Sequence, residues 1–154
     1  GQGISTTPIR LLMAVASIAN GGHLMRPYVN AENSPEEVGR TISREASHQV
    51  VDMMVSAVDK AFIAQIKNYS VAGKTGTAQV PRLGGGKGYT DEVINTYIGF
   101  APAYDPEFIV LIRLDKPYGA PLAGLTVVPA FRELAQFLIT YYNIPPDRIE
   151  IRGS

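Results

Sequence analysis

The sequence predicts an α+β fold in which an antiparallel sheet packs against helices. Apolar residues recur at helical spacing in three segments, which lie near residues 8–19, 43–61 and 126–142. Between the second and third segments they form strand-like runs near residues 71–80, 94–101 and 107–115, with short turns between them. Consecutive strands joined by short turns favour an antiparallel meander, and helices before and after it give the α+β class.

The first helix has clear ends. Thr7 stands in the N-cap position before Pro8, and Asn20 with the two glycines that follow it is a stop signal. Between these ends the residues are apolar on nearly all sides. A helix of that kind is usually buried all round, so we expect it to lie inside something larger than itself.

The second helix is expected to begin near Ser43, where Glu45 is favourably placed against the positive end of the helix dipole. Its predicted apolar stripe consists of Ala46, Val50, Met53, Met54, Ala57 and Ala61. Stripes of this kind are far more often core packing than cofactor sites.

The third helix is expected to start around Thr126 and Pro129 and to stop at residues 143–146, which read Asn-Ile-Pro-Pro. Its predicted apolar stripe consists of Phe131, Leu134, Leu138 and Tyr141. Residues 102–106 (Pro-Ala-Tyr-Asp-Pro) are of types that favour a turn, and they predict one between the second and third strands. A further small pairing is predicted between residues 23–29 and 40–42.

Composition excludes several classes of function. Acidic and basic residues balance at 14 each, which argues against a nucleic-acid partner. The absence of cysteine excludes disulfides, thiolate catalysis and cysteine-based zinc sites. Neither His23 nor His48 has a partner at metal-ligand spacing, so we expect no metal and no cofactor. No leader peptide or membrane-spanning run is evident, and any membrane anchor is expected upstream of Gly1.

The hexapeptide at residues 73–78, Gly-Lys-Thr-Gly-Thr-Ala, is the most informative segment. In a regular strand Lys74 and Gly76 point to one face, and Thr75 and Thr77 point to the other. A strand with such short side chains can accept an extended peptide as an added strand, with hydroxyls meeting a carboxylate. On the hexapeptide alone, an ordinary surface strand is the better interpretation.

A nucleotide-binding P-loop is the rival chemical interpretation, because that pattern also ends in Gly-Lys-Thr. It requires a glycine five residues before Gly73, where this sequence has Asn68, and a helix that starts at the lysine. Residues 75–81 are poor helix formers. We therefore exclude the P-loop.

An ordered series of motifs resembles the serine penicillin-binding proteins and related β-lactamases, of which Lys-Thr-Gly is one defining motif. Residues 1–8 (Gly-Gln-Gly-Ile-Ser-Thr-Thr-Pro) and 19–22 (Ala-Asn-Gly-Gly) resemble the region before that motif in class B enzymes. Residues 71–79, the Tyr-Ile-Gly-Phe-Ala-Pro-Ala run at 97–103 and the Val-Pro-Ala-Phe run at 128–131 continue the series. The tail at residues 142–147 (Tyr-Asn-Ile-Pro-Pro-Asp) is more similar to the cell-division branch than to the elongation branch.

The resemblance has two departures. No serine of this sequence has a lysine three residues on, and the family's Ser-x-Asn motif is also absent. Both motifs lie upstream of the glycine-rich opening in the family, so residues 1–154 are expected to be the C-terminal portion of the transpeptidase domain. The family often has Gly-Thr-Gly before its lysine strand, whereas this sequence has Val-Asp-Lys-Ala-Phe at residues 58–62.

The resemblance implies acyl transfer on peptidoglycan. In the family a serine attacks the carbonyl between two terminal D-alanines of a stem peptide, releases one D-alanine, and passes the acyl group to an amine. β-Lactams mimic that dipeptide and acylate the same serine. By this resemblance Lys74 supplies positive charge, and Thr75 and Thr77, with Gly76 between them, bind the substrate carboxylate. The N–H of Thr77 is one oxyanion donor, so Lys74 and Thr77 are the catalytic candidates.

The same resemblance implies the partners: a stem peptide ending in D-Ala-D-Ala, β-lactam antibiotics, division-complex proteins, and the N-terminal half of the same domain. It implies a location on the extracytoplasmic face of the cell membrane. A catalytically inactive scaffold or binding module is the alternative, and a β-lactam hydrolase is a third. The glycine-rich stretch at residues 84–89 is expected to be a mobile connector, with gating of the site as its alternative role.

The apolar first helix also implies an incomplete core. Three short strands and two amphipathic helices offer limited surface to cover it, and large exposed apolar patches usually mark an interface. We therefore expect the chain to associate with the N-terminal half of the domain or with itself through an uncovered sheet edge.

Overall fold

The computed structural model of this chain describes residues 3–82, 87–119 and 122–148. Within these ranges the larger sheet has three antiparallel strands in the order β3-β4-β5, namely β3 (Ala72–Pro81), β4 (Tyr89–Ala101) and β5 (Phe108–Asp115). A smaller antiparallel pair joins β1 (His23–Met25) to β2 (Glu37–Arg40). The predicted antiparallel meander is confirmed, and the small separate pairing exists but its second strand is Glu37–Arg40 and not residues 40–42.

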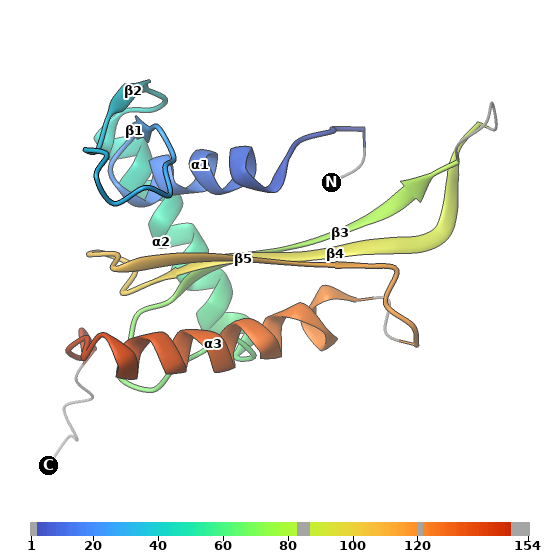
Figure 1. The fold of residues 1–154 in the computed structure, drawn as a ribbon. Helices are drawn as coiled ribbons and strands as arrows, with labels where there is room; N and C mark the ends of the chain where they lie inside the picture. The colour runs from blue at the N-terminus through green and yellow to red at the C-terminus, as the bar shows by residue number, and fades with distance from the viewer. Residues whose placement is uncertain (1–2, 83–86, 120–121, 149–154) are drawn as a thin grey trace, which may run out of the picture.

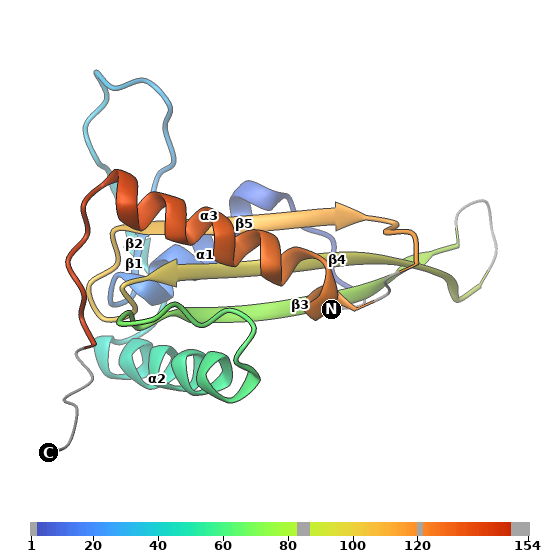
Figure 2. The same cartoon turned by 90° about the horizontal axis from the view of Figure 1, so that it is seen from below.

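Helices cover the larger sheet on three sides (Figure 1). The helix α1 (Pro8–Ala19) lies on one face, and α3 (Val127–Tyr141) follows the short 3-10 turn η1 (Ala123–Leu125) and lies on the opposite face. The helix α2 (Arg44–Ala61) runs beside β3, as the view from below shows (Figure 2). The α+β class is confirmed, and β3 is an edge strand with a helix against part of its outer side.

The predicted helix ends are confirmed. Thr7 Oγ1 accepts a hydrogen bond from the Arg10 N–H at 3.4 Å, and Ser43 Oγ accepts one from the Ala46 N–H at 3.1 Å. Hydrogen bonds from backbone N–H and from Ser43 lower the pKa of Glu45, which keeps this carboxylate ionised in the first turn of α2. The side chain of Asn20 bonds to the backbone of the residue that opens β1 and so ends α1.

Two apolar clusters hold the layers together. On the α1 face of the sheet, Phe100 and Ala72 are fully buried against Ile18 of α1 and Val51 of α2. On the opposite face, Phe131 of α3 is fully buried and its ring centroid lies 4.6 Å from that of Tyr97 on β4. The sheet is therefore the middle of three layers.

Within the part of the chain that the structure describes, α1 is not buried all round, and its place inside something larger stays a prediction. Ser17 is its one buried residue there, and Ile9 keeps 49% of its surface exposed. The reason is geometric: α1 rests on one face of the sheet, and the β1–β2 pair and α2 contact only its C-terminal part.

The predicted stripes of α2 and α3 are also partly wrong. In α2, Met53 is 62% exposed and both Ala57 and Ala61 are exposed, and the buried residues are Ser47, Val51, Met54, Val55 and Val58. In α3, Phe131 is buried as predicted but Leu134 and Tyr141 are exposed, and the other buried residues are Val127, Val128, Ala135 and Ile139. Both helices are apolar on more than one side, and the side that packs against the sheet is the one that is buried.

The strand β4 begins at Tyr89, five residues before the predicted start at Ile94. Residues 90–92 of this extension are polar, so the apolar pattern does not reveal it, and pairing with β3 as far as Pro81↔Tyr89 makes it a strand. Residues 84–86 of the predicted glycine-rich connector lie outside the described residues.

Replacing Phe131 by alanine should lower the free energy of unfolding by about 3–5 kcal/mol, because it empties a fully buried ring position between α3 and the sheet. Urea denaturation of the purified protein measures the loss. The matched control is Phe137→Ala on the outer side of the same helix, where the ring is 60% exposed and the loss should stay below about 1 kcal/mol. Equal losses in the two variants would contradict the assigned orientation of α3.

Candidate functional site

The hexapeptide at residues 73–78 lies in the middle of β3, the edge strand of the larger sheet. Its residues pair with β4 in continuous register from Gly73↔Gly99 to Ala78↔Ile94. An edge strand pairs with another strand on one side only, so backbone groups on its outer side remain available to a ligand laid along it.

The predicted alternation of side chains is confirmed. Thr75 pairs with Tyr97, whose ring packs on Phe131, so Thr75 and Thr77 lie on the α3 face of the sheet. Lys74 is exposed and shares the opposite face with Ala72, which belongs to the cluster under α1. Because β3 is at the edge of the sheet, a ligand lying along its outer side can contact side chains of both faces.

The polar groups of the hexapeptide make few contacts within the described residues. The Lys74 ammonium donates to the carbonyl oxygen of Thr75 at 2.7 Å and has two further protons to donate. The Thr77 hydroxyl accepts a hydrogen bond from the Ala123 N–H at 3.4 Å, which ties the strand to η1. The site is thus a cation and two hydroxyls on one strand, all of them open to an incoming anion.

The two glycines of the motif make room for side chains of β4. A Cβ at Gly73 would overlap with the Tyr97 hydroxyl, and a Cβ at Gly76 would overlap with the Thr96 hydroxyl. A glycine inside a strand often marks a close approach by another group. Here the approaching groups are side chains of the neighbouring strand.

A cavity of about 490 Å³ lies between β3, the end of α2 and η1. Lys74, Thr75 and Thr77 line it together with Gly73, while Gly76 does not. The remaining lining residues are mostly apolar: Ala57, Val58 and Ala61 of α2, Ile63 and Ala64 after it, Tyr97, residues 122–125 and Val128. The structure therefore brings three of the four predicted site residues to one cavity.

A larger cavity, of about 560 Å³, lies between α1, α2 and the turn after β4 and includes none of the hexapeptide. His23 and His48 both line it. Within residues 3–82, 87–119 and 122–148, no group of three or more histidine, aspartate or glutamate side chains is arranged to hold a metal ion.

Sequence reasoning missed two buried polar residues beneath the site. Asn95 is fully buried and donates from Nδ2 to the Thr126 hydroxyl at 3.1 Å. The Tyr97 hydroxyl and Asn95 Oδ1 are buried and have no hydrogen-bond partner among the described residues. Burial raises the pKa of Tyr97, so the phenol stays neutral. Asn95, Tyr97 and Gly99 stand at every second position of β4 and therefore share one face of the strand. This alternation is the sequence signal that could have identified Asn95 and Tyr97 as buried.

The chain matches a family model described as the penicillin binding protein transpeptidase domain over residues 1–136. It is 38% identical over 141 residues to stage V sporulation protein D of Bacillus subtilis, and the match covers 82% of this chain and 22% of that relative. The chain therefore spans less than a quarter of the length of this curated relative.

Solved structures agree with that match. The transpeptidase domain of Burkholderia pseudomallei penicillin-binding protein 3 superposes with a TM-score of 0.80 at 27% identity, covering 97% of this chain and 46% of that chain. Penicillin-binding protein 3 of Mycobacterium tuberculosis in complex with ampicillin gives a TM-score of 0.78 at 28% identity, with 98% and 38% covered.

Replacing Gly73 by alanine should lower the free energy of unfolding by about 2–3 kcal/mol, because the new methyl group overlaps with the fully packed ring of Tyr97. Gly39→Ala on β2 is the matched control. A Cβ there meets nothing within 4 Å, so the change should stay within about 0.5 kcal/mol. Denaturant midpoints of the two variants provide the comparison, and an unchanged midpoint for Gly73→Ala would contradict the close contact.

Proposed function

Since the chain belongs to the transpeptidase domain family of penicillin-binding proteins, we propose that it forms one wall of the active site of a serine-type peptidoglycan D,D-transpeptidase. The observation that carries this proposal is the joint lining of one cavity by Lys74, Thr75 and Thr77 on an edge strand. These are the positions that match the family's Lys-Thr-Gly motif and the threonine after it.

The proposed substrate is a stem peptide that ends in D-Ala-D-Ala. Its terminal carboxylate accepts hydrogen bonds from the hydroxyls of Thr75 and Thr77, which face the cavity side by side. The positive charge of Lys74 strengthens this anion binding, because hydrogen bonds to an ionised group are about twice as strong as neutral ones. β-Lactams carry a carboxylate in the corresponding place, and one of the similar structures is a complex with ampicillin.

The proposed reaction is an acyl transfer in two steps. A serine hydroxyl attacks the carbonyl carbon between the two D-alanines, its proton passes to the departing amine, and an acyl-enzyme remains. A second amine then attacks the ester and regenerates the serine. The N–H of Thr77 donates to the oxyanion of each tetrahedral intermediate, and one such donor contributes about 3 kcal/mol. Lys74 holds positive charge beside the groups that move these protons.

The nucleophile belongs to a part of the domain other than residues 1–154. No Ser-x-x-Lys or Ser-x-Asn motif occurs in this sequence, and we assign both to an N-terminal portion of the same domain. The half-exposed outer side of α1 and the outer edge of β5, which pairs with no strand among the described residues, are consistent with a further portion packing there. We assign this chain to the cell-division branch on its tail sequence.

The proposed location is the extracytoplasmic face of the bacterial cell membrane, where peptidoglycan is cross-linked, and division-complex proteins are the proposed partners. Among the residues that the structure describes, no helix has the length and apolar character needed to cross a bilayer.

Lys74→Ala in the complete domain should nearly abolish acylation by a fluorescent penicillin, because it removes the cation from the cavity. The free energy of unfolding should change by no more than about 1 kcal/mol, since the Lys74 side chain is exposed. Lys116→Ala is the matched control: Lys116 is also exposed but lies beyond the end of β5 and pairs with Glu92. Gel fluorescence over time measures both rates, and normal labelling of the Lys74 variant would refute the role assigned to it.

The chain by itself should form no covalent adduct with a fluorescent penicillin, because the nucleophile is absent. Addition of the serine-bearing portion as a separate chain should restore labelling, and the label should sit on that added chain. Mass spectrometry of the two chains locates it. A label on residues 1–154 would contradict the assignment.

Two further outcomes separate the alternatives. No labelling of the complete domain would favour a catalytically inactive binding module. Rapid release of hydrolysed penicillin would favour a β-lactam hydrolase.

A further inference from the structure

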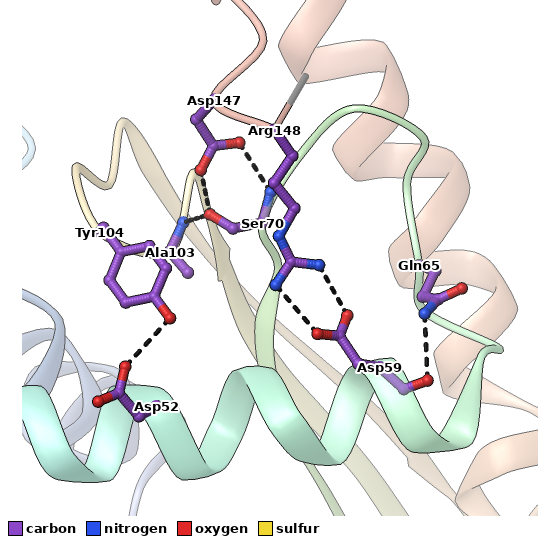
Figure 3. Close-up of polar contacts among 8 residues, drawn as sticks. All are labelled: Asp52, Asp59, Gln65, Ser70, Ala103, Tyr104, Asp147 and Arg148. Carbon is purple, nitrogen blue, oxygen red and sulfur yellow. Dashed lines mark hydrogen bonds and ion pairs between the residues drawn. The ribbon is translucent and has the colours of Figure 1, made fainter. Parts of the chain in front are cut away.

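The segment after α3 returns to the site and binds the connection between α2 and β3. We call residues 144–148 the tail and residues 62–71 the connecting segment. The connecting segment contains no helix or strand, apart from one isolated bridge between Ile66 and Tyr69. Two turns supply backbone hydrogen bonds of its own, from the Gln65 N–H to the Phe62 carbonyl and from the Tyr69 N–H to the Ile66 carbonyl. Its remaining buried backbone groups need partners from elsewhere in the chain. The tail binds two of them, the Ser70 N–H and the Asn68 carbonyl, and Figure 3 shows the contacts around Ser70 and Arg148.

Asp147 is the first of these tail contacts. Its carboxylate accepts a hydrogen bond from the Ser70 N–H at 2.7 Å and a second, short one from the Ser70 hydroxyl. Ser70 is fully buried, and its hydroxyl oxygen accepts the Ala103 N–H at 2.8 Å. Asp147 thus joins the tail to the connecting segment and to the turn after β4 at one point, four residues before Lys74 (Figure 3).

Arg148 makes the second contact. Its guanidinium forms a two-point ion pair with Asp59 of α2, at 2.8 Å and 3.0 Å, and its N–H donates to the Asn68 carbonyl at 3.0 Å. The ion pair lowers the pKa of Asp59, so the pair is charged at neutral pH and is lost as pH falls through that lowered pKa. Gln65 donates to the Asp59 carbonyl at 3.1 Å and ties the connecting segment to the same turn of α2.

These contacts reach both walls of the site cavity. One wall comes from the end of α2 and from Ile63 and Ala64 of the connecting segment, and the other comes from Gly73, Lys74 and Thr75. Arg148 holds the first wall through Asp59, and Asp147 holds the start of the second through Ser70. The tail is therefore a brace across the base of the cavity.

We propose that Asp147 and Arg148 are positioning residues, which set the distance between α2 and the lysine strand and thereby the rate of acylation. The proposal rests on the function proposed above. Neither residue lines the cavity, so their effect must pass through Ser70 and Asp59. Misplacement of reacting groups by about 1 Å is enough to slow an enzyme 100-fold. Lys74 and the Thr77 N–H act mainly in the transition state, so loss of the brace should affect the acylation step more than binding.

The test uses Arg148→Ala and Asp147→Asn in the full-length protein that contains this chain. Acylation by a fluorescent penicillin over a range of concentrations separates the binding constant from the acylation rate constant. We expect the acylation rate constant to fall at least about tenfold in each variant, with a smaller change in the binding constant. The charge-exchanged double variant Asp59→Arg/Arg148→Asp should recover most of the loss, because the pair is about 40% exposed and tolerates either orientation.

The matched control is Arg113→Ala. Arg113 forms a similar two-point pair with Asp115, at 2.7 Å and 3.1 Å and with comparable exposure, but on β5 away from the cavity. Its acylation rate should match the wild type. If the tail variants lower only the thermal midpoint and acylate at the wild-type rate when fully folded, the tail is merely structural and the proposal is overturned.

Amide hydrogen exchange of residues 73–77 provides a readout that does not depend on catalysis. The tail variants should raise exchange there at least tenfold, and Arg113→Ala should leave it unchanged. If the wild type forms no adduct while exchange responds in this way, the proposed function fails and the brace stands. If the wild type is labelled and neither exchange nor acylation responds, the brace alone is refuted.

Discussion

The close contact between β3 and the side chains of β4 is the constraint on which the rest of the site depends. Tyr97 occupies the space where a side chain at Gly73 would stand, and Phe131 reaches to within 2.7 Å of the corresponding position at Gly99. The two rings can pack against each other between sheet and helix only because these strand positions lack a Cβ. That packing fixes α3, and with it η1, against the face that carries Thr75 and Thr77.

The edge position of β3 explains how one strand presents unlike groups to the same ligand. In a central strand the alternation of side chains would separate Lys74 from Thr75 and Thr77 by the whole thickness of the sheet. At an edge the two faces meet, so a carboxylate and a reacting carbonyl lying along the strand are within reach of both. An exposed edge also invites unwanted pairing. Here α2 lies beside the first part of this edge, and the cavity between them gives access to Lys74, Thr75 and Thr77.

The buried polar groups beneath the sheet show a second use of tertiary contacts. Ser70, Asn95 and Ser17 are buried, and each makes a hydrogen bond to a residue of another segment or turn. A buried polar group without a partner is costly, so each of these contacts restricts how the segments pack. The connecting segment before the lysine strand has no regular structure beyond two turns and one bridge, and Asp147 and Arg148 supply contacts that a strand would make in its ladder.

Local chemistry was enough to predict the helix caps at Thr7 and Ser43, the antiparallel meander, and the opposite faces of Lys74 and Thr75, because each depends on neighbours in the chain. The buried side of α2 and α3, the extension of β4, and the pairing of Ser70 with Asp147 were decided by tertiary structure. In the helices, apolar residues on several sides leave the buried face undetermined until a sheet packs against one of them. Ser70 and Asp147 are 77 residues apart, and only the return of the chain after α3 brings a carboxylate to a buried hydroxyl. The periodicity of apolar residues indicates which sides of a segment can be buried. Which side is buried depends on the distant part of the chain that packs against the segment in the folded protein.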